Sequence, residues 1–578
     1  MDDDARGRER AARLQARNER RRAQGKPVWV PDDGWSTASD GSDGAVLPAA
    51  ELAPSAPRRR LLVSTAIFGI STGLSRVLGL VREIVAAYCF GAAGRINAFT
   101  VAFQVPNLVR ALVADAALSS AFVPVFSDLL EHGDRKRAWR VASSLFWLML
   151  LGLTGLTAVF ILIAPWVISI FGNPGHDSGL AVGLSRVLFP IVTLLGVSGI
   201  VVGILNSYDH FTVPALSPVF WNVAIIVGLV IGVPQAHGVD AKLYVYAGSI
   251  LVATFIQVFL PMPWLRGLDR GEERLRIVLD WRDPAVRRVL KLMVPVTLGL
   301  GLININAVID TFFAARYIDP SLAPTAIQKA FLVYMLPQGV FSVAIATVLF
   351  PTLSRLASRG DLLAFADTVS SGIRQIALLL APTAVVSAVL AEPIIRILYQ
   401  RGQWHPAQTP VVAGALAAFS AGLVFNGFML MLNRAFFSLQ SNWIPTWIAL
   451  GNLALNAILD AFFYRFGTWG IPLATAVCNI AGTIALVVLL RRRLGRLGGS
   501  AMSVALSKIF VAAALVAPVS YAIWRPLDSS LGRSFPAQVV SLGVALAAAA
   551  GVYLVACRAL RVRELQALLS LRSRLSRG

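Results

Sequence analysis

Long apolar stretches separated by short polar connections run along the chain from about residue 62 to residue 558. Each stretch is near the roughly 20 residues that an α-helix needs to cross a bilayer. Proline and glycine inside several of them predict kinks. The pattern predicts fourteen membrane-spanning helices, near 62–90, 97–127, 141–171, 181–206, 212–234, 243–264, 286–315, 325–354, 366–398, 409–438, 443–464, 468–490, 503–524 and 536–558.

Composition supports an all-α polytopic membrane protein. Of the 578 residues, 56% are hydrophobic and 14% are charged, whereas soluble domains carry about a quarter charged residues. This excludes an ordinary soluble enzyme, a disordered protein and a disulfide-stapled secreted domain. The three cysteines form neither a CxxC nor a metal-binding pattern, so we expect them to be small buried side chains.

The net charge of +21 would suggest nucleic acid in a soluble protein. Here most basic residues lie in alternate connections between apolar segments, where they report orientation in the membrane, and we expect no nucleic-acid partner. We therefore predict a multi-pass membrane protein with both termini in the cytoplasm. The basic connections on the predicted cytoplasmic side are 135–140, 266–291, 355–359 and 491–496.

The two ends of the chain are polar. Residues 1–60 lack the apolar segment of a signal peptide and are predicted to be a disordered cytoplasmic tail. The basic tail 559–578 fits either a segment bound to anionic lipids or a solvated end.

An internal repeat divides the apolar region. PVFSDLLEHGD (124–134) recurs as PTLSRLASRGD (351–361) at an offset of 227 residues, and weaker matches follow at nearly the same offset. Six predicted helices separate the copies, so both halves should have the same orientation. We predict a six-helix lobe at 61–264, a second at 265–495, and two extra helices within 496–558.

Charged residues inside the first two predicted helices are candidate binding residues, because such charges are costly in a membrane. They are Arg76, Arg82, Glu83, Arg110 and Asp115. The arginines either pair with the two carboxylates and lock the helices together, or leave surplus positive charge facing a cavity. Guanidinium groups bind phosphate oxygens in a bidentate manner, so the second reading predicts a phosphate-bearing substrate.

The second half carries acidic candidates instead. Asp310 occupies the position equivalent to Glu83, and Asn456 and Asp460 lie four residues apart on one helix face. A buried carboxylate beside an amide oxygen suits a monovalent cation or a proton. Alternatively, Asp460 lies at a helix end in interfacial water. The chain has no GxxxxGK[ST] loop, so transport would draw on an ion gradient, the membrane potential or the substrate's own gradient.

Six segments together resemble the MviN-type (MurJ) lipid II flippases of the multidrug/oligosaccharidyl-lipid/polysaccharide exporter superfamily. The resemblance covers about residues 62–495 in matching order. It implies two six-helix lobes and two C-terminal helices that shape a groove for a polyprenyl chain. The segments are SRVLGLVREIVAAYCFG, INAFTVAFQVPNLVRALVADAALSSAFVPVFS, GILNSYDHFTVPALSPVFWN, VAIATVLFPTLSRLA, ILYQRGQW and NRAFFSLQSNWIPT.

The resemblance implies a substrate and its binding residues. The substrate would be the undecaprenyl-pyrophosphate-linked peptidoglycan precursor, lipid II, moved from the inner to the outer leaflet. Cavity residues carried over by position are Arg76, Arg82, Arg110 and Asp115. A sodium site described in some members is matched by Asp310, Asn456 and Asp460, with Thr475 as a looser fourth ligand.

The chain departs from the family pattern at three positions. Asn97 replaces the usual aspartate of the second helix, and Ala111 replaces a second arginine. The family's eighth-helix arginine corresponds to Leu332, with Lys329 nearby but out of register.

Other functions compete with lipid II transport. They are a flippase or exporter for another polyprenyl-linked glycan, a divergent paralogue with an altered substrate, a drug exporter, a membrane-embedded enzyme acting on polyprenyl phosphates, and a non-transporting scaffold. A drug exporter would need acids in the first cavity, and an enzyme would need clustered acids with a metal. The sequence favours a transporter rather than an enzyme and predicts no cofactor beyond sodium or the membrane potential.

Overall fold

A computed structural model describes residues 28–30, 34–36, 58–113, 116–208, 210–266, 268, 274–441, 443–495 and 499–565. The chain divides into two units, Met1–Leu62 and Val63–Gly578. Most of the predicted N-terminal tail, and the C-terminal tail from residue 566 onward, lie outside the described residues.

In the first unit, two short strands pair in an antiparallel manner. Strand β1 (Val28–Val30) pairs with β2 (Gly34–Ser36), and Trp29 lies opposite Trp35. This stretch lies within the tail that the sequence predicts to be disordered, and that prediction stays a prediction. Alternating valine and tryptophan favour extended pairing, which the overall polarity of the tail conceals.

In the second unit, a first group of helices reaches from the start of the apolar region to residue 265. It includes the single turn η1 (Pro174–His176) and the π-helical turn η2 (Gly228–Gly232). Its α-helices are α2 (Arg58–Phe90), α3 (Ile96–Val113), α4 (Ala116–Glu131), α5 (Arg135–Ile170), α6 (Ser178–Leu188), α7 (Pro190–Ser207), α8 (Thr212–Val227), α9 (Val233–Gln235), α10 (Val239–Phe259) and α11 (Met262–Leu265).

A second group follows, and a C-terminal set completes the unit. The second group contains the turns η3 (Ala314–Ile318), η4 (Gln338–Ser342) and η5 (Tyr464–Phe466). Its α-helices are α12 (Pro284–Phe313), α13 (Ala323–Pro337), α14 (Val343–Ser358), α15 (Leu362–Val389), α16 (Ala391–Tyr399), α17 (Gln408–Ala421), α18 (Leu423–Ser438), α19 (Trp443–Phe463) and α20 (Gly470–Leu494). The C-terminal helices are α21 (Gly499–Ala514), α22 (Val516–Leu531) and α23 (Phe535–Ala559).

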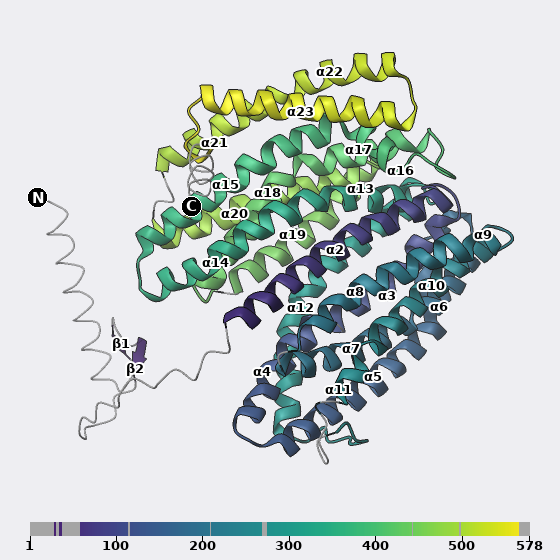
Figure 1. Cartoon of the computed structure of the whole chain (residues 1–578), viewed down its shortest axis with the longest axis vertical. Coiled ribbons are helices and arrows are strands. Elements are labelled where there is room, and N and C mark those ends of the chain that lie inside the picture. Colours follow the sequence, from purple (N-terminus) through teal and green to yellow (C-terminus); the bar gives the residue numbers. More distant parts are fainter. Residues whose placement is uncertain are drawn as a thin grey trace, which may run out of the picture. The chain divides into compact units, whose positions relative to one another are not determined.

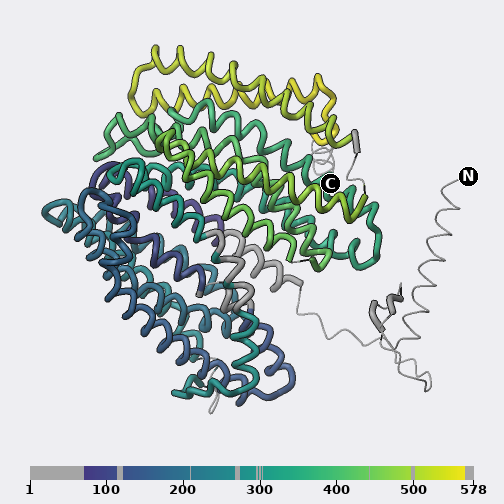
Figure 2. Tube along the Cα trace, turned by 180° about the vertical axis from the view of Figure 1, so that it is seen from behind, coloured from purple at the N-terminus to yellow at the C-terminus, as the bar shows by residue number. Residues whose placement is uncertain are grey.

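Each group has its own apolar core. In the first group, α3, α5, α6, α7, α8 and α10 pack on one another, and in the second group α13–α18 and α20 do so. Helix α12 contacts α3 and α4 of the first group and α19 of the second. Both views show α21–α23 against the second group, on its side away from the first group (Figures 1 and 2). The predicted boundaries of the two lobes stay a prediction.

The predicted class, a polytopic all-α membrane protein, is confirmed, whereas the count of fourteen spans is not. Within the described part of the chain, ten helices are long and apolar enough to cross a membrane, or eleven if α17 and α18, bent by 44°, form one span. Helices α2, α3 with α4, and α12 are not among them.

The predicted repeat has a structural counterpart where its two best-matched segments end. Helices α4 and α14 are each followed by a glycine with positive φ, Gly133 at 78° and Gly360 at 70°. The next residue, Asp134 or Asp361, caps the following long helix by accepting a hydrogen bond from its first turn. The matched Gly-Asp pairs therefore perform the same turn and cap in both halves.

The C-terminal helices are attached to the second group by an ion-pair cluster around the buried Arg396. The Arg396 guanidinium of α16 donates to both carboxylate oxygens of Asp528 in α22, at 2.9 and 2.8 Å, and to Glu392 at 2.7 Å. It also lies 5.9 Å from the ring centroid of Trp524. Further along, the Tyr553 hydroxyl of α23 donates to the carbonyl of Leu378 at 2.8 Å.

Removing Arg396 should therefore destabilise the protein. An Arg396→Met variant leaves the Asp528 carboxylate in its apolar surroundings without its cation, and breaking such a pair costs about 3 to 5 kcal/mol. The double variant Arg396→Met/Asp528→Leu removes both charges and should regain most of that stability. Unfolding in detergent micelles measures both values. Equal destabilisation by the single and double variants would contradict an attachment through this ion pair.

Candidate functional site

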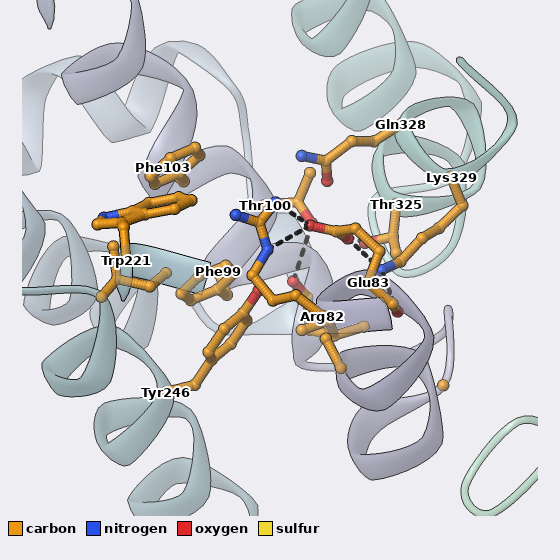
Figure 3. Close-up of a pocket in the computed structure, with 14 residues that line it drawn as sticks. Arg82, Glu83, Phe99, Thr100, Phe103, Trp221, Tyr246, Thr325, Gln328 and Lys329 are labelled. Atoms are coloured by element: carbon orange, nitrogen blue, oxygen red, sulfur yellow. Dashed lines mark hydrogen bonds and ion pairs between the residues drawn. The ribbon is translucent and has the colours of Figure 1, made fainter. Parts of the chain in front are cut away.

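A carboxylate in α2 lies between two cations that come from different helix groups. Glu83 Oε1 accepts from Arg82 Nη2 at 2.7 Å, and Glu83 Oε2 accepts from Lys329 Nζ of α13 at 2.6 Å. The Lys329 ammonium also donates to the backbone carbonyl of Glu83 at 3.1 Å and is 6% exposed. Figure 3 shows Glu83 between the two basic side chains. The cluster thus joins the first helix group to the second.

Two residues of α8 hold the Arg82 guanidinium from its other side. Arg82 Nη1 donates to Asn222 Oδ1 at 3.2 Å, and its Cζ lies 4.8 Å from the ring centroid of Trp221. The buried Asn222 amide in turn donates to the carbonyls of Ser75 and Pro218. The guanidinium plane is therefore fixed by a carboxylate, an amide and an aromatic face.

These side chains line a pocket that carries excess positive charge. Among the lining residues, Arg82 and Lys329 are basic and Glu83 is the single carboxylate, so the formal charge is +1. Aromatic rings of Phe99, Phe103, Trp221 and Tyr246 form much of the wall (Figure 3). Uncompensated charge in such a wall is unfavourable, which favours binding of an anion. The volume of about 80 Å³ has room for a few water molecules only.

The other predicted cavity residues do not join this cluster. Arg76 is exposed, and its guanidinium lies so near Gly339 of η4 that a Cβ there would come within 2.6 Å of Nη1. Arg110 donates to Asn107 Oδ1, one turn earlier in α3, from Nε at 3.2 Å and from Nη2 at 2.9 Å. Asp115 lies outside the described residues. The sequence left two readings open, arginines paired with carboxylates or a surplus of positive charge at a cavity. Arg82 does pair with Glu83, but Lys329 adds a second cation, so the pocket still has a surplus of positive charge.

Beside the pocket, hydrogen bonds close the gap between the two helix groups. The fully buried Asn97 of α3 donates from Nδ2 to the carbonyls of Ala92, Gly94 and Ser321, at 3.0, 3.1 and 2.5 Å. Its Oδ1 accepts from the backbone N–H of Thr325, in the first turn of α13, at 2.9 Å. The amide that replaces the family's aspartate therefore uses both its donor and its acceptor side, which a carboxylate could not do.

Close backbone approaches extend this closure, which we call the inter-group seal (residues 88–100 against 319–325 and 402–408). Thr100 Oγ1 and Thr325 Oγ1 are 2.8 Å apart and buried. The N–H of Gln403 donates to the carbonyl of Tyr88 at 2.9 Å. At Gly402, φ is 61° and a Cβ would lie 2.3 Å from that carbonyl oxygen, so a side chain would force the two chains apart.

The acidic residues predicted in the second half converge on one amide. Asn456 Nδ2 donates to Asp310 Oδ1 at 2.8 Å and to Asp460 Oδ2 at 3.0 Å. Asn306 donates to both oxygens of Asp310, at 3.4 and 3.3 Å. Asp460 is fully buried, which excludes the alternative of an interfacial, water-exposed position. Helices α12 and α19 therefore bring two carboxylates together in the interior.

Two oxygens of this acidic site lack a hydrogen-bond donor within the described part of the chain. They are Asn456 Oδ1 and Asp460 Oδ1, and both are buried. Thr475 Oγ1 instead donates to the carbonyl of Ile471 in its own helix, at 3.4 Å. Buried oxygens without donors beside two carboxylates are the environment that a cation or a proton stabilises.

Sequence reasoning missed three contributors to the pocket. Lys329 was noted only as out of register with an expected arginine, although a lysine in an apolar segment is itself a signal. Trp221 and Asn222 belong to one of the segments that carry the resemblance, but nothing in that segment shows that they contact Arg82. Their role follows from the packing of α8 near α2, which the sequence does not specify.

Solved structures of related fold resemble this chain. A lipid II flippase MurJ in an inward closed conformation matches with a TM-score of 0.69 and 23% identity, covering 86% of this chain and 99% of that one. An inward-facing multidrug resistance MATE family transporter of the MOP superfamily matches with a TM-score of 0.63 and 17% identity, covering 74% and 96%. At these identities the likeness establishes the fold.

Sequence relatives establish the family. A lipid II flippase MurJ from Burkholderia cenocepacia is 30% identical over 431 residues, covering 73% of this chain and 82% of that protein. A probable lipid II flippase MurJ from Vibrio cholerae is 31% identical over 435 residues, covering 72% and 81%. The family model described as lipid II flippase MurJ matches residues 86–530. The predicted resemblance is confirmed, and this multi-pass membrane protein belongs to the MurJ family.

Proposed function

We propose that the protein is a lipid II flippase, which moves the undecaprenyl-pyrophosphate-linked peptidoglycan precursor from the inner to the outer leaflet of the bacterial plasma membrane. The observation that carries the proposal is the pocket around Arg82, Glu83 and Lys329, with two cations against one carboxylate. A pyrophosphate supplies the negative charge that this pocket lacks.

The Arg82 guanidinium is suited to exchange partners with the substrate. Its contacts with Glu83 and Asn222 and its stacking on Trp221 hold the guanidinium plane in one orientation. A phosphate oxygen can accept two parallel N–H bonds from such a group. When Arg82 turns to the substrate, Glu83 would still be neutralised by Lys329. The Glu83 carboxylate would therefore not be left as an unpaired charge in the interior.

Transport by alternating access requires the inter-group seal to open. With the predicted orientation, the seal lies toward the outside, and the pocket beside it is too small for a disaccharide-peptide headgroup. A substrate phosphate that draws Arg82 away from Glu83 changes the balance of charge around the Glu83–Lys329 ion pair, which joins the two groups near the seal. Substrate binding then shifts the equilibrium between closed and open states only through its different affinity for the two.

Another polyprenyl-linked glycan is the alternative substrate. The pocket residues would bind the pyrophosphate, which both substrates share, so they do not distinguish the two. Leu332 also replaces an arginine of the family pattern, which leaves room for a different glycan. Anionic lipids at the basic tails and cell-wall synthesis proteins at the cytoplasmic tails are the further partners that we propose, with both termini in the cytoplasm.

Restoring growth tests the proposed substrate directly. This chain, supplied to a bacterial host depleted of its lipid II flippase, should restore growth and the outward movement of lipid II. An Arg82→Ala variant should lower the rate about tenfold to hundredfold, since a hydrogen bond to a charged group contributes about 1.5 to 3 kcal/mol. It should still fold, because Glu83 keeps Lys329. Arg110→Ala should also lower the rate.

Two further variants serve as controls for Arg82→Ala. Arg82→Lys supplies a point charge without the planar fork and should recover part of the rate. Arg186→Ala removes an exposed arginine of α6 and should leave the rate unchanged. Wild-type transport by Arg82→Ala would exclude pyrophosphate binding at this position and leave Arg82 as a structural partner of Glu83.

Locking the inter-group seal should stop transport. In a background with Cys89, Cys478 and Cys557 replaced by alanine, Thr100→Cys and Thr325→Cys introduce thiols where the two hydroxyl oxygens are 2.8 Å apart. That spacing suits a disulfide across the two groups. Oxidation should abolish lipid II movement, and a reductant should restore it, while each single-cysteine variant remains active. Unimpaired transport with the disulfide verified by mass spectrometry would mean that the seal never opens during the cycle.

We further propose that the acidic site binds a sodium ion that couples transport to the sodium gradient. Asp310, Asn456 and Asp460 would hold the ion, and Thr475 would have to turn from its own helix to join them. The two buried oxygens without donors support the proposal. A cation there would offset the repulsion between two carboxylates in a poorly hydrated interior. The membrane potential is the alternative driving force.

The Asp460→Asn variant tests this coupling. It keeps the size and polarity of the side chain but removes a charge that offsets the desolvation of the ion. We expect slower transport and no remaining sodium dependence, measured with and without sodium at a fixed membrane potential. Asp367→Asn, which alters an acid of α15 outside the site, is the matched control. Unchanged sodium dependence in Asp460→Asn would move the ion elsewhere, and no dependence in either protein would favour a proton or the potential.

A further inference from the structure

The connection that joins the two helix groups contains an irregular segment with three exposed apolar side chains. Residues 274–283 precede α12, and Ile277, Leu279 and Trp281 are 78%, 50% and 55% exposed. The intervening Val278 and Asp280 are half-buried. Three large apolar side chains within five residues are therefore exposed at the surface of the protein.

The depth of this segment follows from its contacts with α5. The N–H of Arg276 donates to Ser143 Oγ at 3.1 Å, and the N–H of Asp280 donates to Ser144 Oγ at 3.3 Å. Both serines follow Arg140, the last basic residue at the start of α5, and precede its long apolar run. The segment therefore lies where α5 passes from polar to apolar, which in a membrane helix marks the headgroup region.

The same segment has a surplus of positive charge. Its two carboxylates are used internally, since Asp280 Oδ1 accepts from the N–H groups of Arg282 and Asp283, both at 3.2 Å, and Asp283 caps α12. Arg282 and Arg287 lie over the Trp281 ring, with Cζ 5.1 and 5.5 Å from its centroid. Residues 274–288 contain five arginines, at positions 274, 276, 282, 287 and 288, and Arg288 Nη1 lies 3.8 Å from Asp128 of α4.

We propose that residues 274–288 are a binding surface for anionic phospholipids of the surrounding bilayer. The side chains of Ile277, Leu279 and Trp281 insert at the level of the headgroups, and Arg282 and Arg287 bind lipid phosphates above the indole ring. Basic side chains around buried apolar ones are the combination by which protein segments bind an anionic leaflet. This surface is separate from the pocket, and the proposal does not depend on which lipid the protein transports.

Lipid bound to this segment should affect the position of helix α12. The segment enters α12 directly through the Asp283 cap, and α12 contacts both helix groups and carries Asp310. A segment bound at the membrane surface fixes the start of α12 relative to the bilayer while the groups move. Anionic lipid should therefore favour a defined position of α12 rather than supply part of the transport pocket.

A fluorescent label at Leu279 tests the proposal in the full chain. Leu279→Cys, in the cysteine-free background, carries an environment-sensitive dye in nanodiscs of phosphatidylcholine alone or mixed with phosphatidylglycerol. We expect blue-shifted emission, quenching by brominated lipids and protection from iodide, all stronger with phosphatidylglycerol. A label at Arg359→Cys, in the exposed turn after α14, is the control and should remain accessible to iodide.

Charge variants separate lipid binding from mere proximity to the membrane. Each of Arg282→Gln and Arg287→Gln should weaken the response to phosphatidylglycerol about fivefold, the contribution of one basic residue at an anionic surface. Unaltered thermal unfolding would show that these variants fold. A Leu279 label that is open to iodide in both lipid mixtures would overturn the proposal, and so would one protected equally with and without both arginines, since protein would then cover it.

Discussion

The arrangement of the protein depends on one buried carboxylate that serves two cations. Glu83 neutralises Arg82 within the first helix group and Lys329 from the second, so the same side chain organises the pocket and links the groups. Neither cation could be buried alone at reasonable cost. Because one carboxylate cannot balance two cations, the contact stays incomplete, and an anion that completes it must also compete for it. The carboxylate of Glu83 and its two cations therefore take part both in substrate recognition and in the contact between the two helix groups.

Much of the fold follows from the sequence because the bilayer imposes simple rules. A helix must be about 20 apolar residues long, and every backbone polar group must be satisfied within it, so apolar runs predict helices. The repeat was predictable for a local reason, since Gly133 and Gly360 occupy a left-handed turn and the following aspartate caps a helix. The π-helical turns η2, η3 and η4 were not predictable, because a widened turn depends on what packs against it.

In the candidate sites too, contacts within one helix were predictable from the sequence, whereas contacts between helices were not. Spacing within one helix predicted that Asn456 and Asp460 share a face, and the structure joins them to Asp310. Contacts between helices required the three-dimensional register. Arg76 and Glu83, seven residues apart, have their Cα atoms on nearly the same side of the helix, yet the adjacent Arg82 pairs with that carboxylate and Arg76 reaches Gly339. A long side chain can cover more than one turn of its helix, so the angle of its Cα does not determine its partner.

The two candidate sites have opposite charge. The pocket between the groups holds a surplus cation, and the acidic site holds two carboxylates around Asn456. From α3 of the first half, Gln104 donates to the carbonyl of Ala307 and to the hydroxyl of Thr311, both at 2.9 Å and within one turn of Asp310. A cation that draws Asp310 toward Asp460 would shift α12 relative to α3, the helix that also carries Asn97 of the seal. The acidic site and the seal therefore have a direct mechanical connection, made of hydrogen bonds between two packed helices.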